Sequence, residues 1–207
     1  MKAWIITSGP IDISRDFRET IQKERPEAVI CADGGIDNAK CLGIRANIVI
    51  GDMDSVQDKN LEGLTVIKYP PEKDKTDTQL AVEYALENGY NDITILTVLG
   101  GMMGHSLANI LLLKYIAERG GKGRILTQNS EVFFLRDEIK LCNNGYRFFS
   151  LLPLTSEVRG VTTEGAKYPL NSETLYIGDT RGISNEFIEE SAKITITKGE
   201  MLVIVDR

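Results

Sequence analysis

Aspartates concentrate where the sequence passes from short apolar runs into loops. Asp33 follows the apolar run 28–31, and Asp52 and Asp54 follow the run 47–50. Because ligands of an open parallel sheet bind outside the carboxyl ends of its strands, we expect these three carboxylates to converge there. If the loop after residue 50 stays extended, Asp52 and Asp54 point to one side and can share a metal ion.

Two further carboxylates, Asp74 and Asp77, lie just before or at the start of a predicted helix over residues 76–88. Negative charge is favoured at a helix N-terminus, and Asp74 or Thr76 could serve simply as the cap. Carboxylates crowded together repel one another unless a cation neutralises them. Hard oxygen ligands suit Mg²⁺, which also coordinates the phosphate oxygens of ATP. The crowding therefore predicts a magnesium site that receives a phosphate substrate.

Glycines and the single histidine add to this candidate phosphate site. Gly34-Gly35, Gly51 and Gly100-Gly101 lack a Cβ and let backbone approach a phosphate, although a Gly-Gly pair also marks ordinary turns. None of them matches a P-loop or a dinucleotide fingerprint. His105 begins the helix that follows Gly100-Gly101. It is either a general base or phosphate contact, or a plain helix-start residue.

The elements that must position these residues change in kind along the chain. Residues 1–124 alternate strand and helix patterns, which predicts a parallel sheet with helices on its faces. The expected strands are 3–7, 28–31, 47–50, 64–69 and 93–99, and the expected helices are 16–24, 36–42, 76–88 and 105–119. Residues 125–207 form a second predicted domain, an antiparallel sandwich or barrel of short strands. There we expect hairpin turns at residues 143–145 and 197–200.

Composition and charge limit the kinds of molecule that the protein could bind and the compartment in which it is expected. The chain of 207 residues carries 24 Lys+Arg against 30 Asp+Glu, a net charge of -6, which argues against a nucleic-acid partner. Its three cysteines, Cys31, Cys41 and Cys142, cannot all pair and match no zinc spacing, so we expect a reducing cytoplasm. No run approaches the roughly 20 apolar residues that cross a bilayer, and the N-terminus has no signal peptide, so we expect no membrane partner.

Six motifs, in the same order, make the chain resemble bacterial thiamine pyrophosphokinases over nearly its whole length. They are Ala32-Asp33-Gly34-Gly35, Gly51-Asp52-Met53-Asp54-Ser55, Lys73-Asp74-Lys75-Thr76-Asp77-Thr78, Gly100-Gly101 through His105 to Asn109, Gly165-Ala166-Lys167-Tyr168-Pro169-Leu170 and Gly182-Ile183-Ser184-Asn185-Glu186-Phe187. The resemblance implies an N-terminal three-layer α/β catalytic domain and a C-terminal β-sandwich domain that binds thiamine. It also implies a homodimer with active sites between subunits, and transfer of the pyrophosphoryl group of ATP to the hydroxyl of thiamine.

The resemblance also implies roles for individual residues. Asp33, Asp52, Asp54 and Asp77 would hold Mg²⁺ and the triphosphate, with Asp74, Lys75, Gln79, Gly100, Gly101, His105 and Asn109 on the ATP side and Tyr168, Ser184 and Asn185 on the thiamine side. Asp77 is the first candidate to accept the alcohol proton, although polarisation by the metal could make a dedicated base unnecessary. The ring of Tyr168 would attract the thiazolium cation, unless that ring belongs to the core.

One motif departs from the family pattern. The family usually has Gly-Gly-Arg-x-Asp-His, whereas this chain reads Gly100-Gly101-Met102-Met103-Gly104-His105. Methionine cannot supply the planar, paired donor with which arginine binds phosphate. We nevertheless expect activity, because the five aspartates remain. The alternatives are a non-catalytic protein that binds thiamine or its diphosphate, and a diphosphokinase for another hydroxymethyl heterocycle such as a pterin.

Overall fold

The computed structural model describes residues 1–11, 14–57 and 61–207, which form two compact units. The first comprises Met1–Gln128 and the second Asn129–Arg207. The sequence predicts a second domain from residue 125 onward, but the strand at residues 122–126 belongs to the first unit. Residues 122–126 pair in parallel with residues 92–96, so this strand completes the parallel sheet.

The first unit contains a six-stranded sheet in which every described pair is parallel. Its strands are β1 (Lys2–Ile6), β2 (Ala28–Ala32), β3 (Ile48–Gly51), β4 (Thr65–Lys68), β5 (Asp92–Leu96) and β6 (Lys122–Leu126). Their order in space is β6-β5-β1-β2-β3-β4. The chain moves outward from β1 to β4 and then returns to the other side of β1. The loops after β1 and β5 therefore lie at a topological switch point, where open sheets bind ligands.

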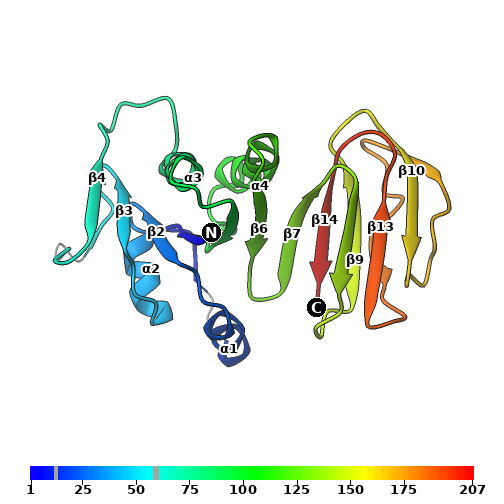
Figure 1. The fold of residues 1–207 in the computed structure, drawn as a ribbon, viewed down its shortest axis with the longest axis horizontal. Coiled ribbons are helices and arrows are strands. Elements are labelled where there is room, and N and C mark those ends of the chain that lie inside the picture. The colour runs from blue at the N-terminus through cyan, green and yellow to red at the C-terminus, as the bar shows by residue number, and fades with distance from the viewer. Residues whose placement is uncertain (12–13, 58–60) are drawn as a thin grey trace. The chain divides into compact units, whose positions relative to one another are not determined.

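Four helices cover the sheet, α3 and α4 on one face and α1 and α2 on the other (Figure 1). They are α1 (Arg15–Lys23), α2 (Gly35–Leu42), α3 (Asp77–Glu87) and α4 (Met103–Glu118). Side chains that alternate along the strands build the two cores. Trp4 and Ile6 pack in the cluster that includes Phe17 of α1, while the intervening Ile5 is fully buried. None of the described helices has the length and apolar character that crossing a membrane requires.

The second unit consists of two antiparallel sheets. Its strands are β7 (Ser130–Leu135), β8 (Glu138–Cys142), β9 (Phe148–Pro153), β10 (Glu157–Glu164), β11 (Glu173–Tyr176), β12 (Asn185–Glu186), β13 (Ser191–Thr195) and β14 (Met201–Asp206). One sheet has the order β12-β9-β14-β7 and the other β11-β10-β13-β8. Among these strands only β10 and β11 are consecutive neighbours within one sheet. The predicted fold class is confirmed, and of the two all-β architectures the structure is the sandwich.

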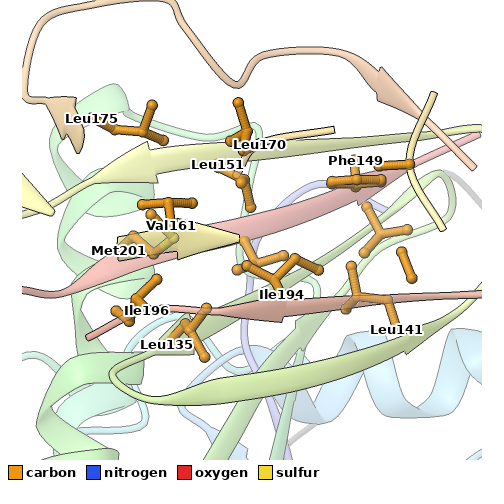
Figure 2. Close-up of a cluster of buried hydrophobic side chains, with 14 of the residues drawn as sticks. Leu135, Leu141, Phe149, Leu151, Val161, Leu170, Leu175, Ile194, Ile196 and Met201 are labelled. Carbon is orange, nitrogen blue, oxygen red and sulfur yellow. The ribbon is translucent and has the colours of Figure 1, made fainter. Parts of the chain in front are cut away.

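The core of the sandwich lies between the two sheets (Figure 2). The β14 strand contributes Met201, Val203 and Val205, whose alternate positions direct all three side chains to the same face. The opposite sheet contributes Leu141 and Ile194. Burial of this shared apolar face explains why the two sheets stay together.

Both predicted hairpin turns are wrong as hairpins, because each joins one sheet to the other. The turn at residues 143–145 has the left-handed φ angles expected of it, 44° at Asn144 and 86° at Gly145. It nevertheless leads from β8 to β9, which pair with different partners, and residues 197–200 lead from β13 to β14 in the same way. Turn residues specify a local reversal, whereas strand pairing follows from which apolar faces are buried.

The β10 strand is not predictable from the sequence pattern. Gly160, with φ 65°, interrupts this strand, and the register with β11 shifts between Val158 and Val161. Such a bulge destroys the period of two by which a strand is recognised in a sequence.

Candidate active site

Three carboxylates gather at the carboxyl ends of β2 and β3. Ala32 lies opposite Ile50 in the parallel pairing, and the backbone N–H of Asp33 donates to the carbonyl of Ile50 at 2.8 Å. Asp33, which follows β2, therefore lies beside the start of the loop that follows β3. One carboxylate oxygen from each of Asp33, Asp52 and Asp54 lies within 4.8 Å of the other two. This is the spacing at which several carboxylates can share one cation.

The loop after β3 reaches this arrangement by a turn. Met53 is buried and has a φ of 70°, and Asp52 Oδ1 accepts the backbone N–H of Asp54 at 3.2 Å. An aspartate that bonds its own backbone two residues on stabilises a local turn. The loop is therefore not extended, which was the condition under which the two carboxylates were expected to share one side. Asp52 and Asp54 come to the same side because the chain curls around Met53.

Gly51 allows a second element to join the group. A Cβ at this position would lie 2.9 Å from Asp33 Cβ, closer than real Cβ atoms come, and 3.1 Å from Asp77 Oδ1, which is also tight. Asp77 is the first residue of α3, and Thr76 caps that helix by accepting the N–H of Gln79 at 3.2 Å. Of the two caps that we considered, Thr76 fills the position and Asp74 is exposed on the preceding loop.

A lysine lies among these carboxylates. Lys73 Nζ lies 3.3 Å from Asp52 Oδ2 and 3.0 Å from Asp77 Oδ1, and its side chain is only 14% exposed. Asp33 is buried, and its Oδ1 accepts no hydrogen bond within the described part of the chain. A buried carboxylate oxygen without a donor indicates that a further cation belongs there. The all-oxygen donor set fits Mg²⁺.

The two carboxylates that contact Lys73 have pKa values shifted in opposite directions by their surroundings. Burial raises the pKa of Asp77 above its ordinary value, although the Lys73 ammonium opposes this shift. The backbone N–H of Asp54 holds the pKa of Asp52 below its ordinary value, and Lys73 adds to this effect. In the absence of a metal ion, Asp77 is therefore the more basic of the two.

Two neighbouring residues of α2 anchor the loops around the site. Asn38 Nδ2 donates to the carbonyls of Thr7 and Gly9, at 2.7 and 2.8 Å, and so fixes the loop after β1. Asp37 Oδ2 accepts the N–H of Gln57 at 2.9 Å and fixes the loop after β3. These roles have no signature in the sequence, because the partners of both side chains are backbone atoms of distant segments.

The glycine loop after β5 lies beside the loop after β1. Gly100 and Gly101 are exposed, and a Cβ on either would lie 3.7 to 3.9 Å from Pro10. Asn109 is buried and donates to the carbonyl of Val98 at 3.4 Å, which makes it a support of this loop. His105 is exposed in the first turn of α4.

Two residues assigned to the ATP side converge on a residue that we had not considered for the site. Glu83 accepts hydrogen bonds from Lys75 Nζ at 2.7 Å, from Gln79 Nε2 at 3.2 Å and from the hydroxyl of Tyr115. Tyr115 belongs to α4, so Glu83 links the two helices. A sequence reading could find Gln79 and Glu83 by their helical spacing, but not their contact with Tyr115.

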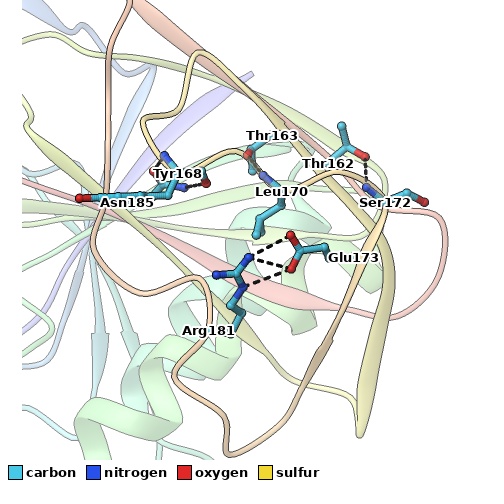
Figure 3. A network of polar contacts seen from close by, with 8 residues as sticks. All are labelled: Thr162, Thr163, Tyr168, Leu170, Ser172, Glu173, Arg181 and Asn185. Carbon is cyan, nitrogen blue, oxygen red and sulfur yellow. Dashed lines mark hydrogen bonds and ion pairs between the residues drawn. The ribbon is translucent and has the colours of Figure 1, made fainter.

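The candidate thiamine residues lie in the second unit. Tyr168 is 56% exposed, whereas Asn185 is only 4% exposed and bonds the backbone of Tyr168 (Figure 3). Ser184 is exposed and has a φ of 55°. Non-glycine residues with such φ angles concentrate at functional sites. The structure therefore brings all three together, with different exposure.

A parallel α/β unit with carboxylates gathered at its strand ends, together with a separate β-sandwich, defines a two-domain protein whose candidate site suits a divalent cation. Residues 21–122 match the family model described as thiamin pyrophosphokinase, catalytic domain, and residues 137–201 match the one described as thiamin pyrophosphokinase, vitamin B1 binding domain. The chain belongs to the thiamin pyrophosphokinase family.

Individual relatives agree with this assignment. A thiamine pyrophosphokinase of Bacillus subtilis is 29% identical to the chain, with 97% of this chain and 96% of the relative covered. A crystal structure of thiamine pyrophosphokinase from Bacillus subtilis superposes with a TM-score of 0.89 at 27% identity, covering 100% and 99% of the two chains. A thiamin pyrophosphokinase from Geobacillus thermodenitrificans gives 0.87 at 25% identity, covering 100% and 98%.

Proposed function

We propose that the protein is a thiamine diphosphokinase, which transfers the pyrophosphoryl group of ATP to the hydroxyl of thiamine and releases AMP. The observation that carries the proposal is the convergence of Asp33, Asp52 and Asp54, joined by Asp77, at the carboxyl edge of the parallel sheet. Family membership supplies the substrate class, because both the catalytic and the vitamin B1 binding models match.

Asp33, Asp52, Asp54 and Asp77 would hold Mg²⁺, which would neutralise the triphosphate and polarise the phosphorus that is attacked. The chain itself supplies position and proton transfer. Loops fixed by Asn38 and Asp37 hold the phosphate end, and the glycines after β5 let backbone N–H groups approach it. Asp77, the first candidate for a base, would take the proton of the attacking hydroxyl. Alignment and charge neutralisation are the main terms in such a transfer.

Incubation of the protein with ATP, Mg²⁺ and thiamine tests the function. We expect AMP and thiamine diphosphate in equal amounts, and loss of both with Asp54→Asn. Asp92→Asn is a matched control, because Asp92 is half exposed at the opposite end of a strand and pairs only loosely with Lys2, at 3.7 Å. Thiamine binding without AMP release would favour the non-catalytic binding protein. AMP release with a hydroxymethylpterin in place of thiamine would favour the other diphosphokinase.

We also propose that the protein is a cytoplasmic homodimer with active sites between subunits, as the family resemblance implies. All three cysteines are free, which suits a reducing compartment. Light scattering after gel filtration tests assembly, since one chain has a mass of 23.0 kDa. A mass near twice that value is expected, and a concentration-independent monomer would contradict the dimer.

A further inference from the structure

We infer that Asn185 is a positioning residue that holds the backbone of Tyr168, so that the Tyr168 ring presents its face to a cationic heterocycle. This inference rests on the proposed function, because it concerns the site that would receive thiamine. It departs from the role that the family resemblance implies for Asn185, which is direct contact with the substrate.

Three of the four hydrogen bonds that the Asn185 amide can form are committed to the protein. Its Oδ1 accepts the backbone N–H of Tyr168 at 3.0 Å and that of Glu186 at 3.0 Å, which uses both lone pairs of the oxygen. Its Nδ2 donates to the carbonyl of Tyr168 at 2.7 Å. The side chain thus bonds both polar backbone groups of Tyr168, as Figure 3 shows. It therefore has no free acceptor and a single N–H to offer a ligand, and only 4% of its surface is exposed.

The segments on either side extend this contact into a backbone pairing. The N–H of Lys167 donates to the carbonyl of Glu186 at 2.9 Å, and Ala166 forms an isolated bridge with Phe187. Residues 166–168 therefore run beside residues 185–187. Lys167 Nζ also pairs with Glu186 Oε1 at 2.8 Å. The backbone around Tyr168, residues 166–168, is thus paired with β12, and β12 in turn pairs with β9 of the sandwich. We call this pairing of residues 166–168 with residues 185–187 the mount of Tyr168.

The ring of Tyr168 contrasts with its fixed backbone. It is 56% exposed, so the ring is not a core residue, and the ammonium of Lys167 lies 5.5 Å from its centroid. That distance falls within the range at which a ring face attracts a cation. An aromatic side chain on a rigid backbone loses little conformational entropy when a ligand stacks on it. The geometry therefore suits a flat, positively charged heterocycle, and leaves the exposed Ser184 as the polar contact.

A double-mutant cycle separates positioning from contact. We expect Asn185→Ala to weaken thiamine binding about tenfold by calorimetry, as loss of two backbone hydrogen bonds at the mount implies, with ATP binding unchanged. If Asn185 acts through Tyr168, adding Asn185→Ala to Tyr168→Ala weakens binding no further. Additive losses would show that Asn185 contacts thiamine itself and would overturn the inference.

Thr163→Val provides the matched control. Thr163 is a buried polar residue of the same segment, but its hydroxyl accepts the N–H of Leu170 at 2.9 Å and does not contact Tyr168. We expect Thr163→Val to lose about as much thermal stability as Asn185→Ala, but to lose less than twofold in thiamine affinity. An equal loss of affinity in both variants would make the effect of Asn185 a general one and would overturn the inference.

Amide hydrogen exchange without substrate tests the mount independently of the proposed function. The Tyr168 N–H should exchange slowly in the wild type and at least tenfold faster in Asn185→Ala; unchanged exchange would refute the mount. Should Asn185→Ala fail to fold, Asn185→Ser, which keeps one hydroxyl acceptor, takes its place. A wild type that binds no thiamine but shows the expected exchange would refute the proposed function and leave the mount intact.

Discussion

At the scale of single residues, the site is organised around one ammonium group. Lys73 lies between Asp52 and Asp77, which would otherwise repel each other across the ends of two elements. Burial alone would lower its pKa, but the pKa is raised because the ammonium donates hydrogen bonds to Asp77 and Asp52 and is attracted by their charges. In the absence of a divalent ion, Lys73 is the charge that makes this group of carboxylates tolerable.

Lys73→Met should therefore make stability depend on magnesium. Without divalent ions we expect a loss of about 2 kcal/mol, somewhat less than fully buried pairs show because Lys73 keeps some exposure. Saturating Mg²⁺ should restore more stability to the variant than to the wild type. Thermal unfolding with EDTA and with Mg²⁺ measures both. Lys68→Met, at the exposed end of β4, should show neither effect, and equal behaviour of the two variants would contradict the role of Lys73.

The residues that could be predicted are those whose chemistry shows in the sequence. Aspartates after strands are visible because the carboxyl ends of parallel strands share one edge, and the structure places Asp33, Asp52 and Asp54 together there. Gly51 and Met53 were not predictable in their roles. Gly51 is required because Asp77 of α3 approaches it closely, and Met53 occupies a left-handed turn. Both features depend on tertiary structure.

At the scale of elements, Glu83 joins α3 to α4 through Tyr115 and also holds Lys75. Burial would raise the pKa of Glu83, but the hydrogen bonds from Lys75, Tyr115 and Gln79 lower it below the ordinary 4.5. A carboxylate whose folded-state pKa is depressed stabilises the fold above its unfolded-state pKa, and this contribution is lost as the pH falls through the folded-state value. The link between the helices should therefore weaken in acid.

Glu83→Gln should remove this pH dependence. We expect the variant to be about 1 kcal/mol less stable than the wild type at pH 7, with the difference shrinking as the pH falls below about 4.5. Denaturant titrations from pH 3 to pH 7 measure it. Glu118→Gln removes a more exposed carboxylate that pairs with Lys114 and should leave the pH profile nearly unchanged. A constant difference between Glu83→Gln and wild type at all pH values would count against the argument.

The start of α4 is the element that departs from the family pattern. Met102 occupies the N-cap position without a side-chain hydrogen bond, and Met102 and Met103 are 71% and 73% exposed. Exposed methionines here leave the glycine loop without a fixed cation for phosphate. We had expected this helix to begin at residue 105. It begins at Met103, two residues before the histidine, with Met102 as its N-cap.

Met102→Arg should lower the KM for ATP about fivefold, equivalent to about 1 kcal/mol for an exposed ionic contact, and leave the KM for thiamine unchanged. The gain should shrink at high salt, because exposed charges are screened. Met103→Arg adds the same charge one residue later at equal exposure, and serves as the control. Equal gains from both variants would indicate a general charge effect in place of a directed contact.

At the scale of the whole molecule, alternating strand and helix patterns predicted an α/β domain, and the short strands that follow them predicted an all-β domain. This fold class is confirmed. What the sequence could not supply is the path between the sheets of the sandwich. Nearly every connection crosses from one sheet to the other, so neighbouring strands in sequence, such as β8 and β9, are not neighbours in a sheet. Pairing of this kind is decided by the shared core and has no local signature.

Because each unit has its own core, each ligand should protect the unit that binds it. An unreactive ATP analogue with Mg²⁺ should slow amide exchange most in residues 33–37, 51–57 and 73–79, where the carboxylates and their anchors lie. Thiamine alone should slow it most in residues 165–170 and 182–187, which mount Tyr168. Exchange read by mass spectrometry distinguishes these peptides. Thiamine protection confined to residues 1–128 would place its principal contacts away from Tyr168, because ligand binding suppresses the local opening of the segments it contacts.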